Sequence, residues 1–357
     1  MIKKNNLNYY IKNLIFIKNY INFYTYMKIC LYEKKLGYYS NKIINIGNKG
    51  DYTTFSEMGI IFTNCLSLNI NKALNLLNGG YIIEIGAGTG MLAYKLLKEC
   101  YKLKTKCKGY KIIEISEKLK KIQKKFLKKK NLQYKIEWIS KLKKNVDITG
   151  IIICNEIIDA FPNYAFSIKN KKLSEKIITL NNFNYFQWSI IKIKKNLIKY
   201  INYINLKSNN YESEINLLIF PWIKKISSII NRGYIFIFDY GYTRKEYYNY
   251  IRKEGTIMCH YKHYAIKNIF INKGTQDITC HVDFTSIYES IKLNNMNYIK
   301  FEYLSKFFFK NKIKKLIKQY NKNNIKTNKE INKFMFPQEM GEVFKIICYG
   351  KNINKKI

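Results

Sequence analysis

Two acidic side chains and an amide follow the apolar run IIIC, at the point where a buried strand must end. They are Asn155, Glu156 and Asp159 of the stretch NEIIDAFP (155–162). Side chains at the carboxyl end of a parallel strand face the crevice where α/β sheets bind ligands. Two carboxylates there could hold a planar cation by accepting its N–H groups in bidentate fashion. The alternative is structural, with Asp159 capping a helix and Glu156 accepting from backbone amides.

A glycine-rich turn, EIGAGTG (84–90), lies between an expected strand and an expected helix. Glycines let the backbone turn tightly and approach a ligand, and the free amides at the start of the helix point toward that ligand. Dinucleotide enzymes use the spacing GxGxxG here, whereas this chain has GxGxG, preceded by Glu84 inside the strand. The spacing disfavours a nicotinamide cofactor, and a turn that only packs helix on strand is the structural alternative.

This turn and a second acid, Glu114, resemble the S-adenosylmethionine (SAM) site of Rossmann-like methyltransferases. Glu114 lies near the end of the next expected strand. In that family the acid at this position accepts hydrogen bonds from both ribose hydroxyls, a role suited to a carboxylate. The resemblance implies SAM as the cofactor, with Glu84 facing its amino-acid moiety. The expected cofactor-binding residues are Glu84, Gly86, Ala87, Gly88, Gly90, Glu114 and Asn155.

Alternating strand and helix patterns surround these motifs. The expected strands span 81–85, 109–115, 133–139, 150–154 and 233–241, with helices over 91–100 and from Ser116 onward. Repeated βαβ units predict an α/β fold, with a mostly parallel sheet covered by helices on both faces. The last apolar run, VFKIICYG (343–350), is expected to form an edge strand.

The expected organisation has two parts. Residues 1–78 form a helical N-terminal extension that carries the loop GDYTTFSE, and residues 79–350 form a Rossmann-like methyltransferase domain. Inserts interrupt this domain at about 163–231 and at about 255–342. Short strand-like runs in the first insert favour an antiparallel unit. We expect the extension and the inserts to roof the cleft.

The formal charge of +40 suggests that nucleic acid or an anionic membrane could be a partner. Lysine supplies nearly all of it, because arginine, the better residue for bidentate phosphate recognition, occurs only at Arg232, Arg244 and Arg252. Abundant Lys, Asn, Ile and Tyr are typical of AT-rich codon usage, so we attribute the charge to composition and expect no nucleic-acid partner. No apolar run approaches the roughly 20 residues that span a bilayer, so membrane insertion is not expected.

The cysteines and the N-terminus bear on location. Eight cysteines are scattered without a CxxC pair in a chain too long to need disulfides, which is typical of reduced thiols in a cytosol-like compartment. Mitochondrial transit peptides favour arginine, and the N-terminal segment has none. We therefore expect a cytoplasmic bacterial protein, with the mitochondrial matrix as the alternative. The sequence gives no indication of the oligomeric state.

A closer resemblance covers most of the chain. YMKICLYEKKLGYYS, GDYTTFSEMGIIF, EIGAGTG, NEIIDAFP, FDYGYTRKEYY and GTQDITCHVDFT fall in the order found in the MidA-like methyltransferase family. Mitochondrial members of that family are arginine methyltransferases needed for the assembly of respiratory complex I. The resemblance implies a SAM-dependent enzyme that methylates a protein partner, such as a respiratory-chain subunit.

The stretch NEIIDAFP favours a cationic substrate over a nucleic-acid base. Methyltransferases that modify base amino groups often carry (D/N)PPY at this place, and its aromatic side chain stacks on the base. Here there are no tandem prolines, and Glu156 and Asp159 stand there instead. A guanidinium stays protonated at neutral pH and offers several N–H donors in a rigid plane. We therefore expect Glu156 and Asp159 to be catalytic and to orient an arginine.

Other substrate contacts are expected from the loop before the first strand and from the ends of later strands. These residues are Asp51, Thr54, Glu57, Asp239, Tyr240, His281 and Asp283. A metal site is suggested by the three histidines, His260, His263 and His281, because imidazole is a common metal ligand. They lie in a strand-like pattern, however, and we expect no metal. Buried structural hydrogen bonding is the alternative for His281 and Asp283.

Two other functions stay open at the level of the sequence. An RNA methyltransferase would fit the charge, and its affinity would fall steeply with salt because phosphate contacts release counterions. A non-catalytic assembly factor could retain the fold. The intact turn 84–90, Glu114 and the stretch 155–162 argue against that second alternative.

Overall fold

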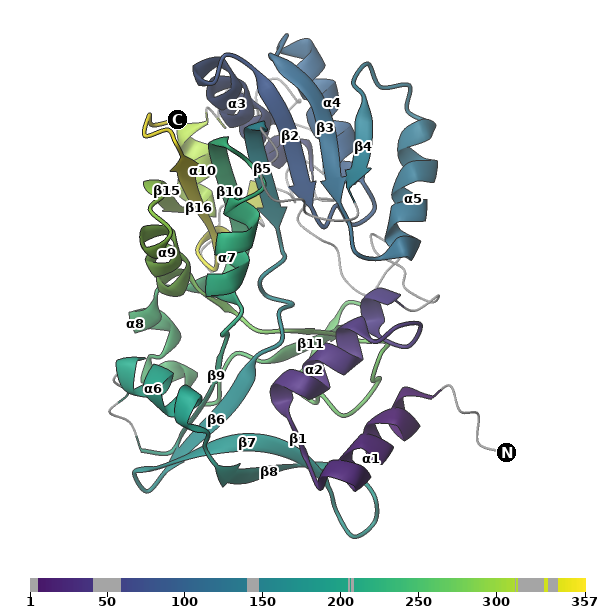
Figure 1. Cartoon of the computed structure of the whole chain (residues 1–357), viewed down its shortest axis with the longest axis vertical. Helices are drawn as coiled ribbons and strands as arrows, with labels where there is room; N and C mark the ends of the chain where they lie inside the picture. Colours follow the sequence, from purple (N-terminus) through teal and green to yellow (C-terminus); the bar gives the residue numbers. More distant parts are fainter. Residues whose placement is uncertain are drawn as a thin grey trace.

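A mostly parallel sheet forms the centre of the fold (Figure 1). The structure is a computed structural model that describes residues 6–40, 59–139, 148–204, 206, 209–311, 313, 331–332 and 340–357. The strands of this sheet are β2 (Gly80–Ile85), β3 (Cys107–Ile113), β4 (Ile136–Ile139), β5 (Thr149–Asn155), β10 (Arg232–Tyr242), β14 (Val282–Asp283), β15 (Asn297–Tyr303) and β16 (Phe344–Lys351). Strands β10, β5, β2, β3 and β4 run parallel, which confirms the predicted α/β class.

The order of the strands reverses between β2 and β5. The sheet reads β15-β16-β10-β5-β2-β3-β4, so the chain runs outward from β2 on one side and from β5 on the other. Helices α4 (Met91–Lys102) and α5 (Glu117–Lys128) form the crossovers on the β2 side. Ligands of α/β proteins bind in the crevice at the carboxyl ends of the strands flanking such a reversal. In this chain those ends lead into the turn 84–90 and the stretch 155–162.

The prediction that 343–350 forms an edge strand is wrong. Strand β16 pairs antiparallel with β10 on one side and with β15 on the other, so β15 is the edge. All residues of β16 except Lys351 are buried. A continuous apolar run such as IICY is typical of a strand covered on both faces, and it does not indicate whether another strand pairs on its outer side.

Helices cover both faces of the main sheet. Successive residues of a strand face opposite sides, so Ile82 packs on one face and Ile83 on the other. Helices α3 (Ile60–Leu76), α4 and α10 (Leu304–Lys310) bury their apolar residues on the first face. Helices α7 (Ile219–Ser227) and α9 (Phe284–Leu293) do so on the second. These two cores fix the strand ends that carry the site.

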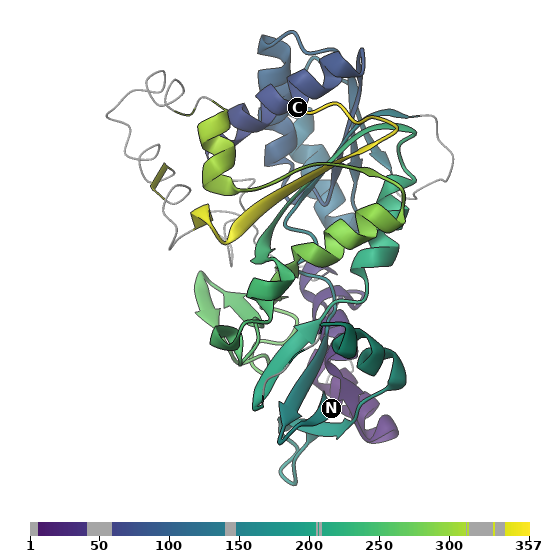
Figure 2. The same cartoon turned by 90° about the vertical axis from the view of Figure 1, so that its left-hand side faces the viewer.

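An antiparallel sheet forms a second lobe beside the main one (Figure 2). Its strands are β1 (Ile21–Asn22), β6 (Tyr164–Lys169), β7 (Lys172–Leu180), β8 (Phe186–Lys192) and β9 (Tyr211–Ile215), and α6 (Lys195–Ile204) packs on it. The N-terminal helices α1 (Leu7–Lys18) and α2 (Phe23–Tyr32) join this lobe, because Ile21 of β1 pairs with Ile178 of β7. The N-terminal segment and the strands of the first expected insert thus share one core.

The second lobe continues into a smaller sheet of β11 (Met258–Tyr261), β12 (Tyr264–Ile266) and β13 (Asp277–Thr279). Figure 1 shows β11 beside α2, in the gap between the antiparallel lobe and the main sheet. The expected substrate residues Asp51, Thr54 and Glu57 lie outside the residues that the structure describes. Among the residues that it does describe, no helix combines the length and apolar character needed to cross a membrane.

Candidate active site

Two cavities meet at Glu156, which follows β5 and lines both of them. The smaller cavity, of about 460 Å³, is bounded by the glycine-rich turn, Glu114 and Asn155, with side chains from α2 on its other wall. The larger cavity, of about 570 Å³, is bounded by Asp159, by residues 252–260 and by β13. A residue shared by two cavities is well placed to act between two bound molecules.

The glycine turn leaves its backbone open to the smaller cavity. Gly86 and Gly88 have φ angles of +65° and +51°, in the left-handed region that glycine tolerates best. A Cβ on Gly86 would lie 2.4 Å from Cδ1 of Ile157, whereas a Cβ on Gly88 would meet no atom within 4 Å. Gly86 therefore permits close packing on the stretch 155–162. Gly88 leaves space that a ligand can fill.

Two other residues of the turn have packing roles. Gly90 begins α4 at φ +86°, and a Cβ there would lie 3.3 Å from Cδ1 of Leu127 in α5. Ala87 is buried. Neither is among the described residues that line the smaller cavity. Ala87 and Gly90, which were expected to contact the cofactor, therefore support the turn without lining the cavity.

Glu84 also lies beneath the turn rather than on the cavity wall formed by the described residues. Its side chain is buried, and the Tyr110 hydroxyl donates to its Oε2 at 2.7 Å. Burial raises the pKa of Glu84 to about 7, although the hydrogen bond from Tyr110 acts in the opposite direction. A positive group arriving in the smaller cavity would favour the ionised form of this carboxyl.

Glu114 lies on the wall of the smaller cavity, and Gln123 of α5 holds it there. Nε2 of Gln123 donates to Glu114 Oε2 at 2.9 Å and to the Gly88 carbonyl at 3.0 Å. Its Oε1 accepts from Nε1 of Trp138 at 3.0 Å. Sequence reasoning missed Gln123, although a signal existed: it lies between Leu119 and Leu127 on the apolar stripe of α5.

Aromatic side chains of the N-terminal segment close the smaller cavity. Tyr24, Tyr32 and Tyr39 line it. The Tyr32 hydroxyl donates to the Ala160 carbonyl at 2.8 Å, and the Tyr39 carbonyl accepts from Oγ of Ser116 at 2.7 Å. These bonds tie the N-terminal segment both to the stretch 155–162 and to the start of α5. The N-terminal segment is thus part of the site.

Asp239, in the last part of β10, organises the stretch that carries Glu156. Its Oδ2 accepts from the backbone N–H groups of Ile157, Ile158 and Asp159 at 3.2, 2.8 and 3.3 Å. Burial raises the pKa of Asp239 to about 7, against the effect of these bonds. Asp239 is fully buried and was expected to contact substrate, whereas the structure gives it a positioning role.

The stretch after β5 is a turn and not a helix, so the interpretation of Asp159 as a helix cap is wrong. Glu156 adopts φ +51°, an uncommon conformation for a residue with a side chain. Backbone strain of this kind concentrates at functional sites, because it holds a side chain in a direction that ordinary geometry would not give.

Asn155 offers an acceptor to the smaller cavity. Its Nδ2 donates to Glu156 Oε1 at 3.1 Å. Its Oδ1 is buried and, within the described structure, has no hydrogen-bond partner. A buried acceptor without a donor costs free energy, so a ligand that supplies an N–H group there would be favoured.

Acidic groups gather at the end of the larger cavity nearest Glu156. Glu156, Asp159 and Asp277 line it together with Tyr240. Burial raises the pKa of Asp159 well above its usual value, and the charges of Asp239, Glu156 and Asp277 raise it further. The pKa of Tyr240 is raised by burial and then by Glu156 and Asp159, so the phenol stays protonated. This end of the cavity favours a cation.

His281 and Asp283 differ in their placement. His281 lines the larger cavity, and burial, aided by the charges of Arg252 and Lys345, lowers its pKa to about 4, so its ring is neutral at pH 7. Asp283 lines neither the smaller nor the larger cavity. It caps α9 by accepting from Thr285 N at 2.9 Å and pairs with Arg244 Nε at 3.0 Å. Within the described chain, no three His, Cys, Asp or Glu side chains form a group that could hold a metal ion.

Comparison with known proteins identifies the family of this chain. Residues 62–301, more than half of the chain, match the family described as "Putative S-adenosyl-L-methionine-dependent methyltransferase". The chain belongs to this family. The methyltransferase is similar in structure to a protein from Burkholderia thailandensis bound to S-adenosyl-homocysteine, with a TM-score of 0.92 and 25% identity over 98% of this chain and 93% of that chain.

A second solved structure gives the same fold. It is a native crystal structure of an uncharacterized protein from Burkholderia thailandensis, with a TM-score of 0.88 and 24% identity over 98% of this chain and 92% of that chain. No curated protein sequence matches the methyltransferase. Its expected cofactor, SAM, is confirmed by the family and by the relative bound to S-adenosyl-homocysteine.

The residues that line the smaller cavity fit the chemistry of SAM. The open space at Gly88 admits a ligand close to the backbone, and the Glu114 carboxylate can accept from hydroxyl groups. The Asn155 Oδ1 can accept from an ammonium group. Gly86, Gly88, Glu114 and Asn155 would hold the cofactor, with Gln123 and Glu84 supporting them from behind.

Proposed function

We propose that this methyltransferase methylates the guanidinium group of an arginine in a protein partner. Glu156 carries the proposal, because it lines both the smaller cavity, where SAM would bind, and the acidic end of the larger cavity. A substrate nitrogen bound at Glu156 would lie next to the cofactor. Because the other carboxylates at this end of the larger cavity favour a positive charge, we expect that nitrogen to belong to a cationic group.

The charge of the larger cavity is unusual for this chain. The protein has 64 lysines and arginines against 24 acidic residues, yet Glu156, Asp159 and Asp277 gather at one end of this cavity. The raised pKa of Asp159 reflects burial and the repulsion of neighbouring carboxylates. A guanidinium stays charged and can satisfy two carboxylates at once, so it would relieve this repulsion on binding.

SAM supplies an electrophilic methyl group bonded to a positively charged sulfur. Glu156 and Asp159 would accept hydrogen bonds from two guanidinium nitrogens and thereby fix the orientation of the third. Asp239 would keep Glu156 in place through the backbone of the turn. Tyr240, as a neutral phenol, can donate to a carboxylate or accept from the substrate.

The larger cavity extends from the main sheet to the second lobe, where Lys176 and Trp188 contribute to its walls. A protein segment could therefore reach Glu156 by passing over the antiparallel sheet. The resemblance to MidA-like methyltransferases makes a respiratory-chain subunit the first partner to test. We propose a cytoplasmic location, in keeping with the scattered cysteines.

The test is to incubate the protein with isotopically labelled SAM and a lysate of cells that lack it, and to map the label by mass spectrometry. The proposal predicts label on arginine nitrogens of one or a few proteins. Label on RNA alone, with binding that weakens steeply as salt rises, would establish the RNA alternative and refute the proposal. Failure to bind SAM by calorimetry would instead favour a non-catalytic role.

A further inference from the structure

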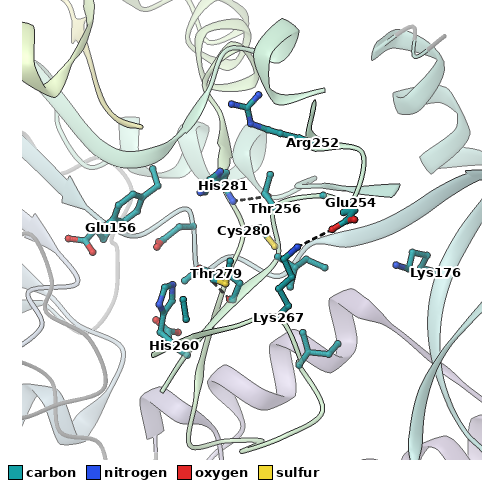
Figure 3. Close-up of a pocket in the computed structure, with 18 of the residues that line it drawn as sticks. Glu156, Lys176, Arg252, Glu254, Thr256, His260, Lys267, Thr279, Cys280 and His281 are labelled. Carbon is teal, nitrogen blue, oxygen red and sulfur yellow. Dashed lines mark hydrogen bonds and ion pairs between the residues drawn. The ribbon is translucent and has the colours of Figure 1, made fainter. Parts of the chain in front are cut away.

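The larger cavity carries opposite charges on its two sides (Figure 3). In the view of Figure 3, Glu156 lies on one side, Lys176 lies on the other, and Arg252 projects above His281. The proposed function accounts for the acidic side. It assigns no role to the opposite side, where Arg252, Lys176 and Lys267 line the wall together with one carboxylate, Glu254.

Arg252 differs from the two lysines in its partners. Lys176 pairs with Glu212, and Lys267 pairs with Glu254 at 2.9 Å. Arg252 donates through Nη1 to the Glu246 carbonyl at 2.7 Å. Within the described part of the chain, no carboxylate forms an ion pair with it. Its charge is therefore available to a ligand in the cavity.

A stacked tyrosine and a second cation reinforce this side. The guanidinium carbon of Arg252 lies 3.6 Å from the ring centroid of Tyr242, which fixes the plane of the guanidinium. Nζ of Lys345 lies 4.8 Å from the same centroid and donates to the carbonyls of Gly241 and Glu342. Burial is the main cause of the lowered pKa of His281, and the charges of Arg252 and Lys345 lower it further.

We propose that Arg252 binds a carboxylate of the substrate, so that the methyltransferase selects an arginine with an aspartate or glutamate close to it in the partner. The inference rests on the proposed function and names its substrate class more narrowly. The two sides of the larger cavity would then bind two substrate groups of opposite charge. The target guanidinium lies at Glu156 and Asp159, and its acidic neighbour lies at Arg252.

The chemistry of arginine explains why a carboxylate is the expected group. A guanidinium held flat by an aromatic ring presents N–H donors in a fork that matches the two oxygens of a carboxylate. The neighbouring His281 ring is neutral at pH 7 and neither competes for the carboxylate nor repels it. A lysine beside the target arginine would meet like charge and be rejected. Arg252 thus acts as a specificity-determining residue.

The test compares three peptides that differ only beside their single arginine, which is flanked by glutamate, glutamine or lysine. Methyl transfer is measured as kcat/KM, and peptide binding is measured by calorimetry in the presence of S-adenosylhomocysteine. The wild type is expected to prefer the glutamate peptide over the glutamine peptide about 10-fold, which corresponds to about 1.4 kcal/mol. Arg252→Glu should reverse the order and favour the lysine peptide.

Arg252→Gln is the milder companion variant, and it should bring the preference for glutamate over glutamine close to one. The matched control is Arg232→Glu, because Arg232 is exposed at the start of β10 and lines neither cavity; it should keep the wild-type order. An unchanged order of peptides in both Arg252 variants would overturn the inference and leave arginine methylation standing. Absence of methylarginine in all peptides, with SAM bound, would refute the proposed function itself.

Discussion

Replacing Glu84 by glutamine should change how the stability of the methyltransferase depends on pH. Glu84 is buried under the glycine turn, and burial raises its pKa to about 7 from the ordinary value of 4.5. Between these two values the folded protein keeps a proton that the unfolded chain has lost. The free energy of unfolding therefore falls as pH rises through this window, and the full cost is present above the folded pKa.

The expected size follows from the shift of the pKa. A difference of about 2.5 units at about 1.4 kcal/mol per unit gives a cost on the order of 3 kcal/mol above pH 7. Glutamine has nearly the same shape, can still bond to the Tyr110 hydroxyl and does not titrate. Relative to the wild type, Glu84→Gln should therefore gain about 3 kcal/mol between roughly pH 4.5 and pH 8.

The assay is urea unfolding without SAM, followed by tryptophan fluorescence at several pH values across this range. Glu117→Gln is the matched control, because Glu117 is an exposed residue of α5; its difference from the wild type should stay nearly constant. If the difference between Glu84→Gln and the wild type also stays flat from pH 4.5 to 8, the account of Glu84 as a proton-holding buried carboxyl is refuted.

Two further predictions concern residues that position the site. Gln123→Leu removes the hydrogen bond that holds Glu114 and should weaken SAM binding about 10-fold, as measured by calorimetry. The control is Gln133→Leu, which changes an exposed residue and should leave the affinity for SAM unchanged. Equal affinities of the two variants would show that Gln123 has no role in the site. Asp239→Ala leaves the amides of the turn unpaired and should lower the free energy of unfolding, measured by urea titration, by about 3 kcal/mol. Asp239→Asn should lower it by less. A smaller effect of the alanine variant would contradict the role given to Asp239.

Much of the fold could be predicted from the sequence, because buried parallel strands have continuous apolar sequences. The run IIIC became β5, and the turn 84–90 fell between β2 and α4, as the pattern indicates. The position of β16 was missed, since a run of this kind does not say which strand will pair on its outer side. Pairing of β1 with β7 was also unpredictable, because it joins Ile21 to Ile178 across a long stretch of chain.

The site could be predicted only in part. Glu156 and Asp159 could be singled out because they follow a buried strand, but the role of Asp239 depends on bonds to residues about 80 positions earlier. Gln123 left a local signal, a polar residue on an apolar stripe. Arg252 left only its rarity among lysines, and its relation to Tyr242 required the three-dimensional structure.

The central claim is that Glu156 joins the SAM cavity to the substrate cavity, and Glu156→Gln tests it most directly. This variant keeps the size of the side chain and the turn held by Asp239 but removes the negative charge. The measurement pairs calorimetry of SAM binding with transfer of labelled methyl groups to the partner protein. We predict SAM affinity within about 3-fold of the wild type and a loss of transfer of at least about 100-fold. Transfer at the wild-type rate would contradict the account.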